Sequence, residues 1–393
     1  MAGLRSYVLA RMLWNPKVDA NAMIDEYLLG VYGKAAPQMK AYLELLHREV
    51  RPGPYGLGAH LWIFTVPDYS DQLLKGGFEL MRQAADAADD PAIRRRVEKD
   101  RLSLEYYSLL RAREYKTSGG QYAPADLDGL KRDAAAFLAR VREHGIKSLH
   151  EGYELKFDDA YYANLQAQQA VTLENGAWRA VIVPALNGRA VELTDKGEGR
   201  DLLRRVPPGD RAYPDAGGIA VGVYPDMHGK ALDVKWSVES SNATELRLKG
   251  EAGGLKLARV YRLTPLGLVT RTEALNGSAS ETAVALQARA EFAPREIDQE
   301  QVTFRSTDGE VVGRRLIIPE KEPTGRETWD GPKLPAGEWR LNHAGAVNAF
   351  SGAERAVLTW SAKSRPQVVL MLWSGDKKLK PGESVALEST YGR

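Results

Sequence analysis

Two short tyrosine–proline–aspartate segments hold the residues best suited to carbohydrate chemistry. They read Tyr213-Pro214-Asp215 and Tyr224-Pro225-Asp226-Met227-His228. Aromatic rings stack on the C–H faces of sugars, and carboxylates accept hydrogen bonds from sugar hydroxyls. The same pattern is also typical of turns, in which proline and aspartate set the backbone. The segments therefore favour either a sugar site or two structured turns.

Hydrolysis of a glycosidic bond requires two carboxyl groups on either side of the sugar, about 5–5.5 Å or 6.5–9.5 Å apart. The catalytic candidates are Asp215, Asp226, His228 and Glu291. Glu291 stands on an apolar strand, and a glutamate buried in such a place can serve as a general acid. The alternative for Glu291 is a structural position at the end of a strand on the surface of a sheet.

The composition excludes several other chemistries. The 393 residues include no cysteine, which excludes disulfides, thiolate metal sites and cysteine nucleophiles. His144, His150 and Glu151 do not have the His-Glu-x-x-His spacing of a zinc helix. Gly217-Gly218 lacks the strand–loop–helix context of a phosphate-binding loop. We therefore expect neither a metal nor a cofactor.

The charge pattern argues against nucleic acid as a partner. The chain carries 54 basic and 52 acidic residues, for a net charge of +2. Its longest basic run, Arg94-Arg95-Arg96, is followed by Glu98 and Asp100 on the same predicted helix, which indicates a solvated face. No apolar run approaches ~18 residues, and no signal peptide opens this chain. We expect a soluble chain without a membrane partner, and the localisation stays open.

Up to about residue 150 the apolar residues follow a helical period. Prolines in Ala36-Pro37 and Asp90-Pro91 stand at first-turn positions, the second behind an aspartate that can cap a helix. The sequence predicts a helical domain of five or six helices over residues 1–150. The apolar stripes that predict three of these helices are Ile24, Leu28 and Val31; Met39, Tyr42, Leu43, Leu46 and Val50; and Leu127, Leu130, Ala134, Leu138 and Val141.

From about Thr172 the period becomes two. Trp178, Ala180 and Ile182 alternate with their neighbours, and turns such as Asn276-Gly277 separate short strands as far as the C-terminus. Many strands without intervening helices predict a large antiparallel β-sandwich over 172–393. Residues 151–171 are expected to join it to the helices. The predicted fold class is α+β multidomain, with an N-terminal helical domain and a C-terminal antiparallel β-sandwich.

The opening stretch, from Leu4 to Pro16 and on to Ile24-Asp25-Glu26-Tyr27, resembles a known helical region. That region follows the catalytic barrel in glycoside-hydrolase-like proteins related to α-glucuronidases and hexosaminidases. The resemblance implies an accessory part of a carbohydrate-active protein, without the catalytic barrel. The first helix has an apolar face made of Tyr7, Val8 and Met12, and an apolar face that its own chain does not cover can serve as an interface. We expect this end to form a homo-oligomer or to stay partly exposed.

The strand region resembles galactose-mutarotase-like domains. The resemblance rests on the segment from Trp178 to Leu193, on Asp226-Met227-His228-Gly229 followed by Trp236, and on Leu379 to Ser384. It implies the supersandwich of that family and a histidine–glutamate pair for opening sugar rings. His228 matches the first histidine of the family. The expected second one is absent from Leu286–Phe292, so the resemblance implies a sugar-binding cleft rather than mutarotase activity.

These observations lead to a carbohydrate partner and three alternatives for function. The first is a glycoside-hydrolase-related accessory region that binds or shapes a glycan site. The second is a free-standing, exo-acting glycosidase that uses carboxylates of the sandwich or between the domains. The third is a structural or oligomerising protein. The residues expected to bind carbohydrate, meeting together with Asp226 on the concave side of the sandwich, are Arg189, Tyr224, His228 and Trp236.

Overall fold

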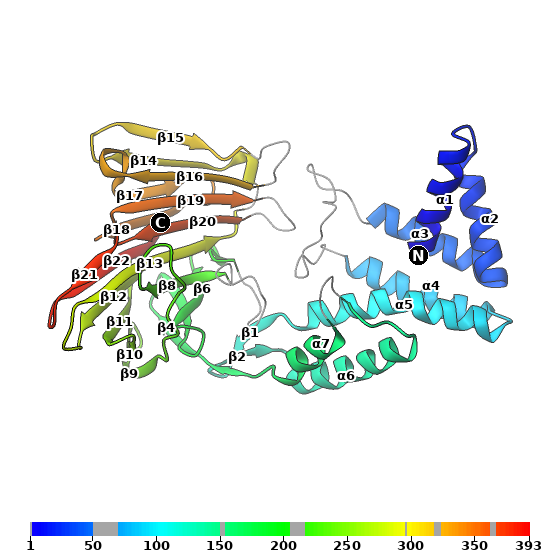
Figure 1. The fold of residues 1–393 in the computed structure, drawn as a ribbon, viewed down its shortest axis with the longest axis horizontal. Helices are drawn as coiled ribbons and strands as arrows, with labels where there is room; N and C mark the ends of the chain where they lie inside the picture. The colour runs from blue at the N-terminus through cyan, green and yellow to red at the C-terminus, as the bar shows by residue number, and fades with distance from the viewer. Residues whose placement is uncertain are drawn as a thin grey trace. The chain divides into compact units, whose positions relative to one another are not determined.

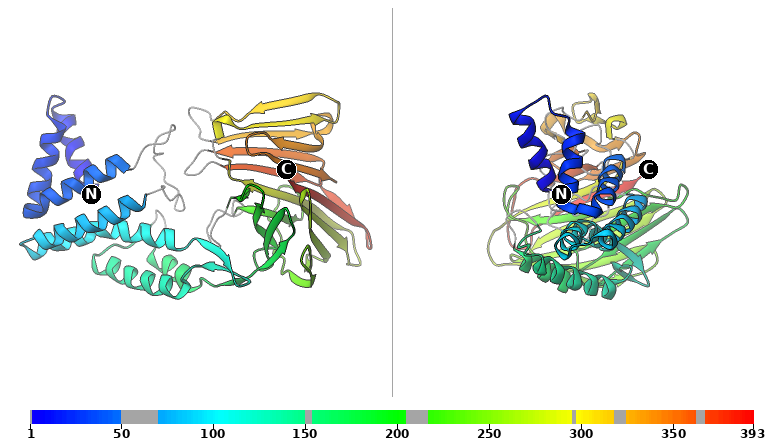
Figure 2. Two further views of the ribbon diagram at one scale, coloured as in Figure 1. Left: turned by 180° about the vertical axis from the view of Figure 1, so that it is seen from behind. Right: turned by 90° about the vertical axis from the view of Figure 1, so that its right-hand side faces the viewer.

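The computed structural model divides the chain into two compact units (Figure 1). The first contains Met1–Glu114 and Pro124–Leu165, and the second contains Tyr115–Ala123 and Gln166–Arg393. Figure 2 shows the helices of the first unit and the strands of the second from two further sides. The structure describes residues 2–49, 70–149, 154–204, 217–294, 297–317, 324–361 and 367–393.

The first unit is helical, as the sequence predicts. Asp90 caps its longest helix by accepting a hydrogen bond from the Ala92 N–H at 2.7 Å, with Pro91 in the first turn. Ser70 caps another helix by accepting from the Leu73 N–H at 3.0 Å. The described elements are α1 (Ala2–Trp14), α2 (Ala20–Tyr32), the short η1 (Gly33–Ala35), α3 (Ala36–Glu49), α4 (Asp71–Ala87), α5 (Pro91–Ala112), α6 (Leu127–Glu143) and α7 (Leu155–Ala163).

The helices α2 to α5 share one core, in which Leu28, Met39, Met81 and Leu104 are buried. The helix α1 is less covered. Leu4 is buried and the ring of Tyr7 lies 5.4 Å from that of Tyr27, but Leu13 and Trp14 at its end are 86% and 92% exposed. Over the described residues, no helix is long and apolar enough to span a membrane.

Two features of this part of the chain did not follow from its periodicity. The strands β1 (Tyr115–Ser118) and β2 (Gln121–Pro124) form a hairpin around Gly119 and Gly120, which both adopt positive φ. The helix α7 lies inside the segment expected to be the joint. Both elements are short, and four to nine residues give too few repeats for a period to stand out.

The second unit consists of antiparallel sheets, which confirms the predicted sandwich. In the order of their pairing, the nine-stranded sheet contains β15 (Val311–Arg315), β14 (Gln301–Ser306), β17 (Pro335–Leu341), β18 (Ala346–Ser351), β22 (Ser384–Gly392), β12 (Gly267–Asn276), β11 (Leu255–Thr264), β10 (Glu245–Ala252) and β9 (Ser237–Ser241).

The ten-stranded sheet carries the residues that matter below. Its main path runs through β16 (Thr324–Asp330), β19 (Arg355–Ser361), β20 (Gln367–Trp373), β13 (Thr282–Phe292), β8 (Gly218–Tyr224), β6 (Arg189–Asp195), β5 (Trp178–Val183) and β4 (Val171–Glu174). In addition, β21 (Lys377–Leu379) pairs with β13 and β7 (Arg200–Asp201) with β6, while β3 (Gln168–Gln169) joins β2.

Strand alternation gives the ten-stranded sheet two different faces. Leu286, Ala288 and Ala290 of β13 belong to one buried cluster with residues of the nine-stranded sheet. Because side chains of a strand alternate between faces, Gln287, Arg289 and Glu291 point to the opposite side. We call that side the outer face of the ten-stranded sheet.

Candidate functional site

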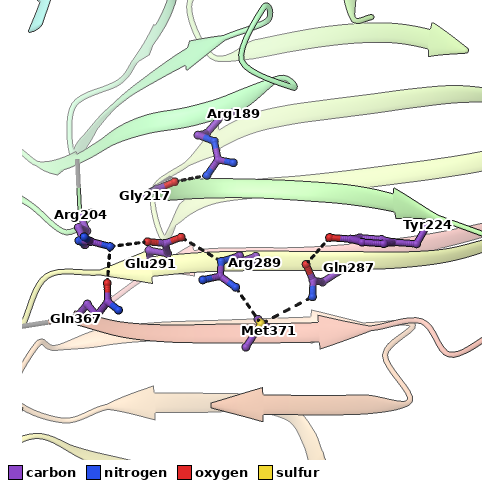
Figure 3. A network of polar contacts seen from close by, with 9 residues as sticks. All are labelled: Arg189, Arg204, Gly217, Tyr224, Gln287, Arg289, Glu291, Gln367 and Met371. Atoms are coloured by element: carbon purple, nitrogen blue, oxygen red, sulfur yellow. Dashed lines mark hydrogen bonds and ion pairs between the residues drawn. The ribbon is translucent and has the colours of Figure 1, made fainter. Parts of the chain in front are cut away.

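Three polar side chains follow one another along β13 on the outer face (Figure 3). Gln287, Arg289 and Glu291 are only 7%, 7% and 0% exposed. We call these three residues the polar row. Buried polar groups are costly unless they are hydrogen-bonded, so their partners define what the site can do.

Glu291 ends the polar row as an ion-paired carboxylate. Its Oε1 accepts a hydrogen bond from Arg289 Nε at 3.1 Å, and its Oε2 accepts one from Arg204 Nη1 at 3.2 Å. Arg204 also donates to Gln367 of β20. Both carboxylate oxygens are thus occupied by guanidinium groups, an arrangement typical of a structural anchor. Glu291 is buried, as its position on an apolar strand predicts, and it is paired with two arginines.

The other end of the polar row meets two aromatic rings. The Tyr224 hydroxyl donates to Gln287 Oε1 at 3.2 Å. The ring of Tyr224 lies 5.0 Å from that of Trp373, with a tilt of 54° between the planes. Tyr224 is buried, whereas Trp373 is only partly buried. We call Tyr224 and Trp373 the aromatic pair.

Met371 lies between the aromatic pair and the guanidinium groups. Its sulfur accepts a hydrogen bond from Arg289 Nη1 at 3.2 Å, and Gln287 Nε2 lies 3.8 Å from it. A thioether is a weak acceptor compared with a hydroxyl or a carbonyl oxygen. Oxygen atoms of a ligand are therefore better acceptors for these two N–H donors than the sulfur that now receives them.

The segment with His228 follows the aromatic pair directly. Asp226 Oδ1 accepts a hydrogen bond from the His228 N–H at 2.8 Å, which is the turn that proline and aspartate predict. The Met227 N–H donates to Asp376 Oδ1 at 2.7 Å, and Asp376 comes three residues after Trp373. The exposed side chains of Asp226 and His228 thus stand at the Trp373 end of the outer face.

The structure separates Arg189 from this end. Arg189 is buried, and its Nη1 donates to the Gly217 carbonyl beside the first residue of β8, whereas Tyr224 is the last. A strand rises about 3.3 Å per residue, so the two ends of β8 lie about 20 Å apart. Arg189 and Tyr224 therefore do not share a site the size of one sugar.

Trp236 is also elsewhere, in the core between the two sheets. Its Nε1 donates to Asn187 Oδ1 at 2.9 Å, and the Arg259 guanidinium lies 4.1 Å from the centre of its ring. Arg259 is fully buried and donates to the Asn187 carbonyl at 2.7 Å, to the Val221 carbonyl and to Thr272 Oγ1. Trp236 thus belongs to a structural network that fastens the Asn187 turn.

Tyr261 completes that network. It is fully buried, and its hydroxyl donates to the Gly188 carbonyl. Burial raises the pKa of Tyr261, against the opposing effect of the nearby Arg259 charge. The phenol therefore keeps the proton that it donates, and the turn stays fastened over the pH range in which proteins work.

The two described carboxylate candidates cannot act as a glycosidase pair. Glu291 is paired in register with Gly218, whereas Asp226 follows Tyr224, which is paired with Ala285. Six residues of strand, about 20 Å, separate the two ends. Both known arrangements need less than about 10 Å. Asp215 and Tyr213 lie outside the described residues.

A metal centre is not formed by the parts of the chain that the structure describes. Within them, no group of three or more histidine, cysteine, aspartate or glutamate side chains is arranged to hold an ion. Of the three residues considered for zinc, His150 and Glu151 lie outside the described residues, and only His144 can be placed.

Trp373 is the site residue that the sequence did not reveal. A regular alternation along β20 does place Trp373 on the same side as Met371 and Val369. The alternation predicts which face of β20 carries Trp373, but it does not predict which strand lies beside β20. The pairing of β20 with β13, about 80 positions earlier in the chain, is what brings Trp373 to the polar row.

Residues 1–44 match a family model described as a domain of unknown function (DUF4838). The resemblance of the opening helices to glycoside-hydrolase-like proteins stays a prediction, because that description states no function. No curated protein matches the chain.

The similar solved structures include galactose-mutarotase-like folds. One is a galactose mutarotase-like protein from Lactobacillus casei, 13% identical over 57% of this chain and 99% of its own, with a TM-score of 0.44. Another is a putative aldose 1-epimerase from Escherichia coli K12, 13% identical over 57% of this chain and 98% of its own, with a TM-score of 0.43. The 4-alpha-glucanotransferase from Thermococcus litoralis is 12% identical over 80% of this chain and 48% of its own, with a TM-score of 0.37.

Proposed function

We propose that the outer face of the ten-stranded sheet binds carbohydrate at the end where Tyr224 and Trp373 meet. The observation that carries this proposal is the aromatic pair, which lies next to the amide of Gln287 and within reach of the Arg289 guanidinium. Sugar sites combine a ring for the apolar face of the sugar with a few fixed polar groups for its hydroxyls.

Each group has a role in this proposal. The ring of Trp373, a partly buried residue, stacks on the sugar, and the ring of Tyr224 supports it. Gln287 and Arg289 exchange the weak sulfur acceptor of Met371 for sugar hydroxyls. His228 and Asp226, on the exposed turn beside Trp373, contact the sugar at the rim. Arg189 and Trp236 take structural roles instead.

This site fits an accessory region of a carbohydrate-active protein better than a free-standing glycosidase. Binding needs only the aromatic pair and the polar row, whereas hydrolysis needs two carboxylates close together. Glu291 is occupied by two guanidinium groups, and Asp226 accepts the hydrogen bond of its own turn. The role of the helices in bracing a catalytic barrel follows from the predicted resemblance alone.

The test is binding by the full chain after removal of the Trp373 ring. Affinity electrophoresis with xylan, galactomannan, β-glucan and pectin identifies a retained glycan, and calorimetry with its oligosaccharides gives the Kd. We expect Trp373→Ala to weaken binding at least tenfold, about 1.4 kcal/mol, because stacking is lost. Trp373→Phe should keep part of the affinity, and Trp14→Ala, which removes an exposed ring of the helical unit, should keep all of it.

Two results would overturn the proposal. One is the absence of retention by every glycan in the panel. The other is equal affinity of the Trp373→Ala and Trp14→Ala variants for a glycan that does bind. Turnover of chromogenic glycosides by the wild-type chain, abolished by Asp226→Asn, would favour the glycosidase instead.

A further inference from the structure

A cavity lined by polar side chains lies on the nine-stranded sheet, away from the polar row. Its volume is about 300 Å³, and it is lined by Gln299, Gln301, Arg315 and His343. This volume is at the lower end of the range for small-ligand sites and fits a molecule the size of a monosaccharide. Among the residues that the structure describes, the side chains that line the cavity are uncharged or basic.

Strand pairing places two of the lining residues side by side. Gln301 begins β14 and is paired in register with Arg315, the last residue of β15. Directly paired residues of antiparallel strands point to the same face. The next residue of β14, Val302, is fully buried in the core, so Gln301 and Arg315 point outward.

A buried carboxylate fixes the third lining residue. Glu300 is fully buried, and its Oε1 accepts from the His343 N–H at 3.0 Å and from the Gln301 N–H at 3.1 Å. Its Oε2 accepts from the Ala344 N–H at 2.8 Å. The turn that carries His343 is thus fastened to β14. The three backbone N–H groups compensate the charge of the Glu300 carboxylate. Glu300 therefore has a structural role, and the side chains of Gln301, Arg315 and His343 are the groups that can contact a ligand.

Donors of Arg315 and Gln301 remain available to a ligand. Arg315 Nε donates to the Asp298 carbonyl at 3.1 Å, and this holds the guanidinium in place while its two terminal nitrogens stay as donors. Gln301 Oε1 accepts from Asn342 Nδ2 at 3.3 Å, and this leaves the Gln301 amide nitrogen as a donor. A guanidinium fork matches the oxygens of a carboxylate or a phosphate, and amides and imidazole match hydroxyls.

We propose that this cavity is a second binding site, for a small hydroxyl-rich molecule that carries an oxyanion. A sugar acid and a sugar phosphate share this chemistry. Arg315 binds the oxyanion, and Gln301 and His343 bind the hydroxyls. The site goes beyond the proposed glycan-binding face, because it uses no residue of the aromatic pair or of the polar row.

The experiment follows the imidazole C–H resonance of His343 in the full chain by NMR, assigned with His343→Gln. Glucose 6-phosphate, galacturonate and glucose are added in turn. We expect a saturable shift with one or both of the charged sugars, at an affinity at least tenfold higher than with glucose. The tighter of the two identifies phosphate or carboxylate as the preferred oxyanion.

A matched pair of variants tests the role of Arg315. Arg314 is its neighbour on β15, faces the opposite side of the strand and pairs with Glu327 at 3.2 Å. We expect Arg315→Gln to weaken binding at least tenfold and Arg314→Gln to leave it within twofold. No saturable shift with either charged sugar, equal binding of glucose, or equal effects of the two substitutions would each overturn the proposal.

Discussion

The contacts of Glu291 lead to a different role from the one that its sequence position suggests. From sequence, a glutamate on an apolar strand suits a general acid. In the structure it is fully buried and accepts hydrogen bonds from Arg204 and Arg289. Removing one partner of such a buried arrangement leaves the remaining charges uncompensated. Its role is to hold the guanidinium groups of the outer face in place.

Replacing Glu291 should therefore affect stability. We expect Glu291→Gln to lower the free energy of unfolding by about 3 kcal/mol, because Arg204 and Arg289 lose their shared carboxylate. Glu273→Gln is the control, since Glu273 is a partly exposed glutamate of β12 that lies 3.5 Å from Arg271 and accepts a hydrogen bond from Ser384, and it should change the value by less than about 1 kcal/mol. Urea unfolding measures both, and equal values for the two variants would exclude the anchoring role.

Two asparagine–glycine turns of the sandwich differ in what surrounds them. Gly188 has a φ of +61°, and a Cβ there would lie 2.9 Å from Arg259 Nη1 and 3.0 Å from Leu248 Cδ1. Gly176 has no atom within 4 Å of its would-be Cβ. Only the first turn is enclosed by the core, where Arg259 and Tyr261 bind its carbonyl groups.

Alanine should distinguish the two turns. We expect Gly188→Ala to lower the free energy of unfolding by at least about 2 kcal/mol, because it combines backbone strain with a clash in a packed core. Gly176→Ala should change the value by less than about 1 kcal/mol. Urea unfolding of both variants checks this, and a tolerated Gly188→Ala would mean that the Asn187 turn is not held as described.

Elements were predictable from sequence wherever their signals are local. The Asp90-Pro91 start of α5 and the alternation along β5 depend on residues only a few positions apart. Which strands become neighbours depends on pairs far apart, such as β13 with β8 and β20. Because these pairings do not show in the local pattern, the sequence does not indicate Trp373 as a site residue. It also predicts Arg189 and Trp236 beside Tyr224, whereas the structure places Arg189 at Gly217 and Trp236 at Asn187.

At the scale of the molecule, the two units have cores of unequal size. Among the described residues, 26 buried hydrophobic side chains belong to the helical unit and 56 to the unit with the sandwich. Buried apolar area is the main favourable term in folding, so the helical unit is expected to be the less stable one.

Heating should show this difference. The sandwich holds six of the eight tryptophans, so fluorescence reports mainly on it, whereas the circular dichroism signal at 222 nm reports mainly on helices. We expect the dichroism signal to fall at a lower temperature than the fluorescence changes. A single transition seen at the same temperature by both probes would contradict the prediction. The six tryptophans are Trp178, Trp236, Trp329, Trp339, Trp360 and Trp373.

The most direct measurement for the whole molecule is the response of its tryptophan side chains to a bound glycan. In a ¹H–¹⁵N spectrum each indole N–H gives one signal, and Trp373→Phe assigns the one at the aromatic pair. With saturating oligosaccharide of the retained glycan, we predict a large shift of the Trp373 signal. The signals of Trp14, exposed on the helical unit, and of Trp339, fully buried in the core, should stay unchanged. Saturable binding that leaves the Trp373 signal in place would contradict a carbohydrate site on the outer face of the ten-stranded sheet.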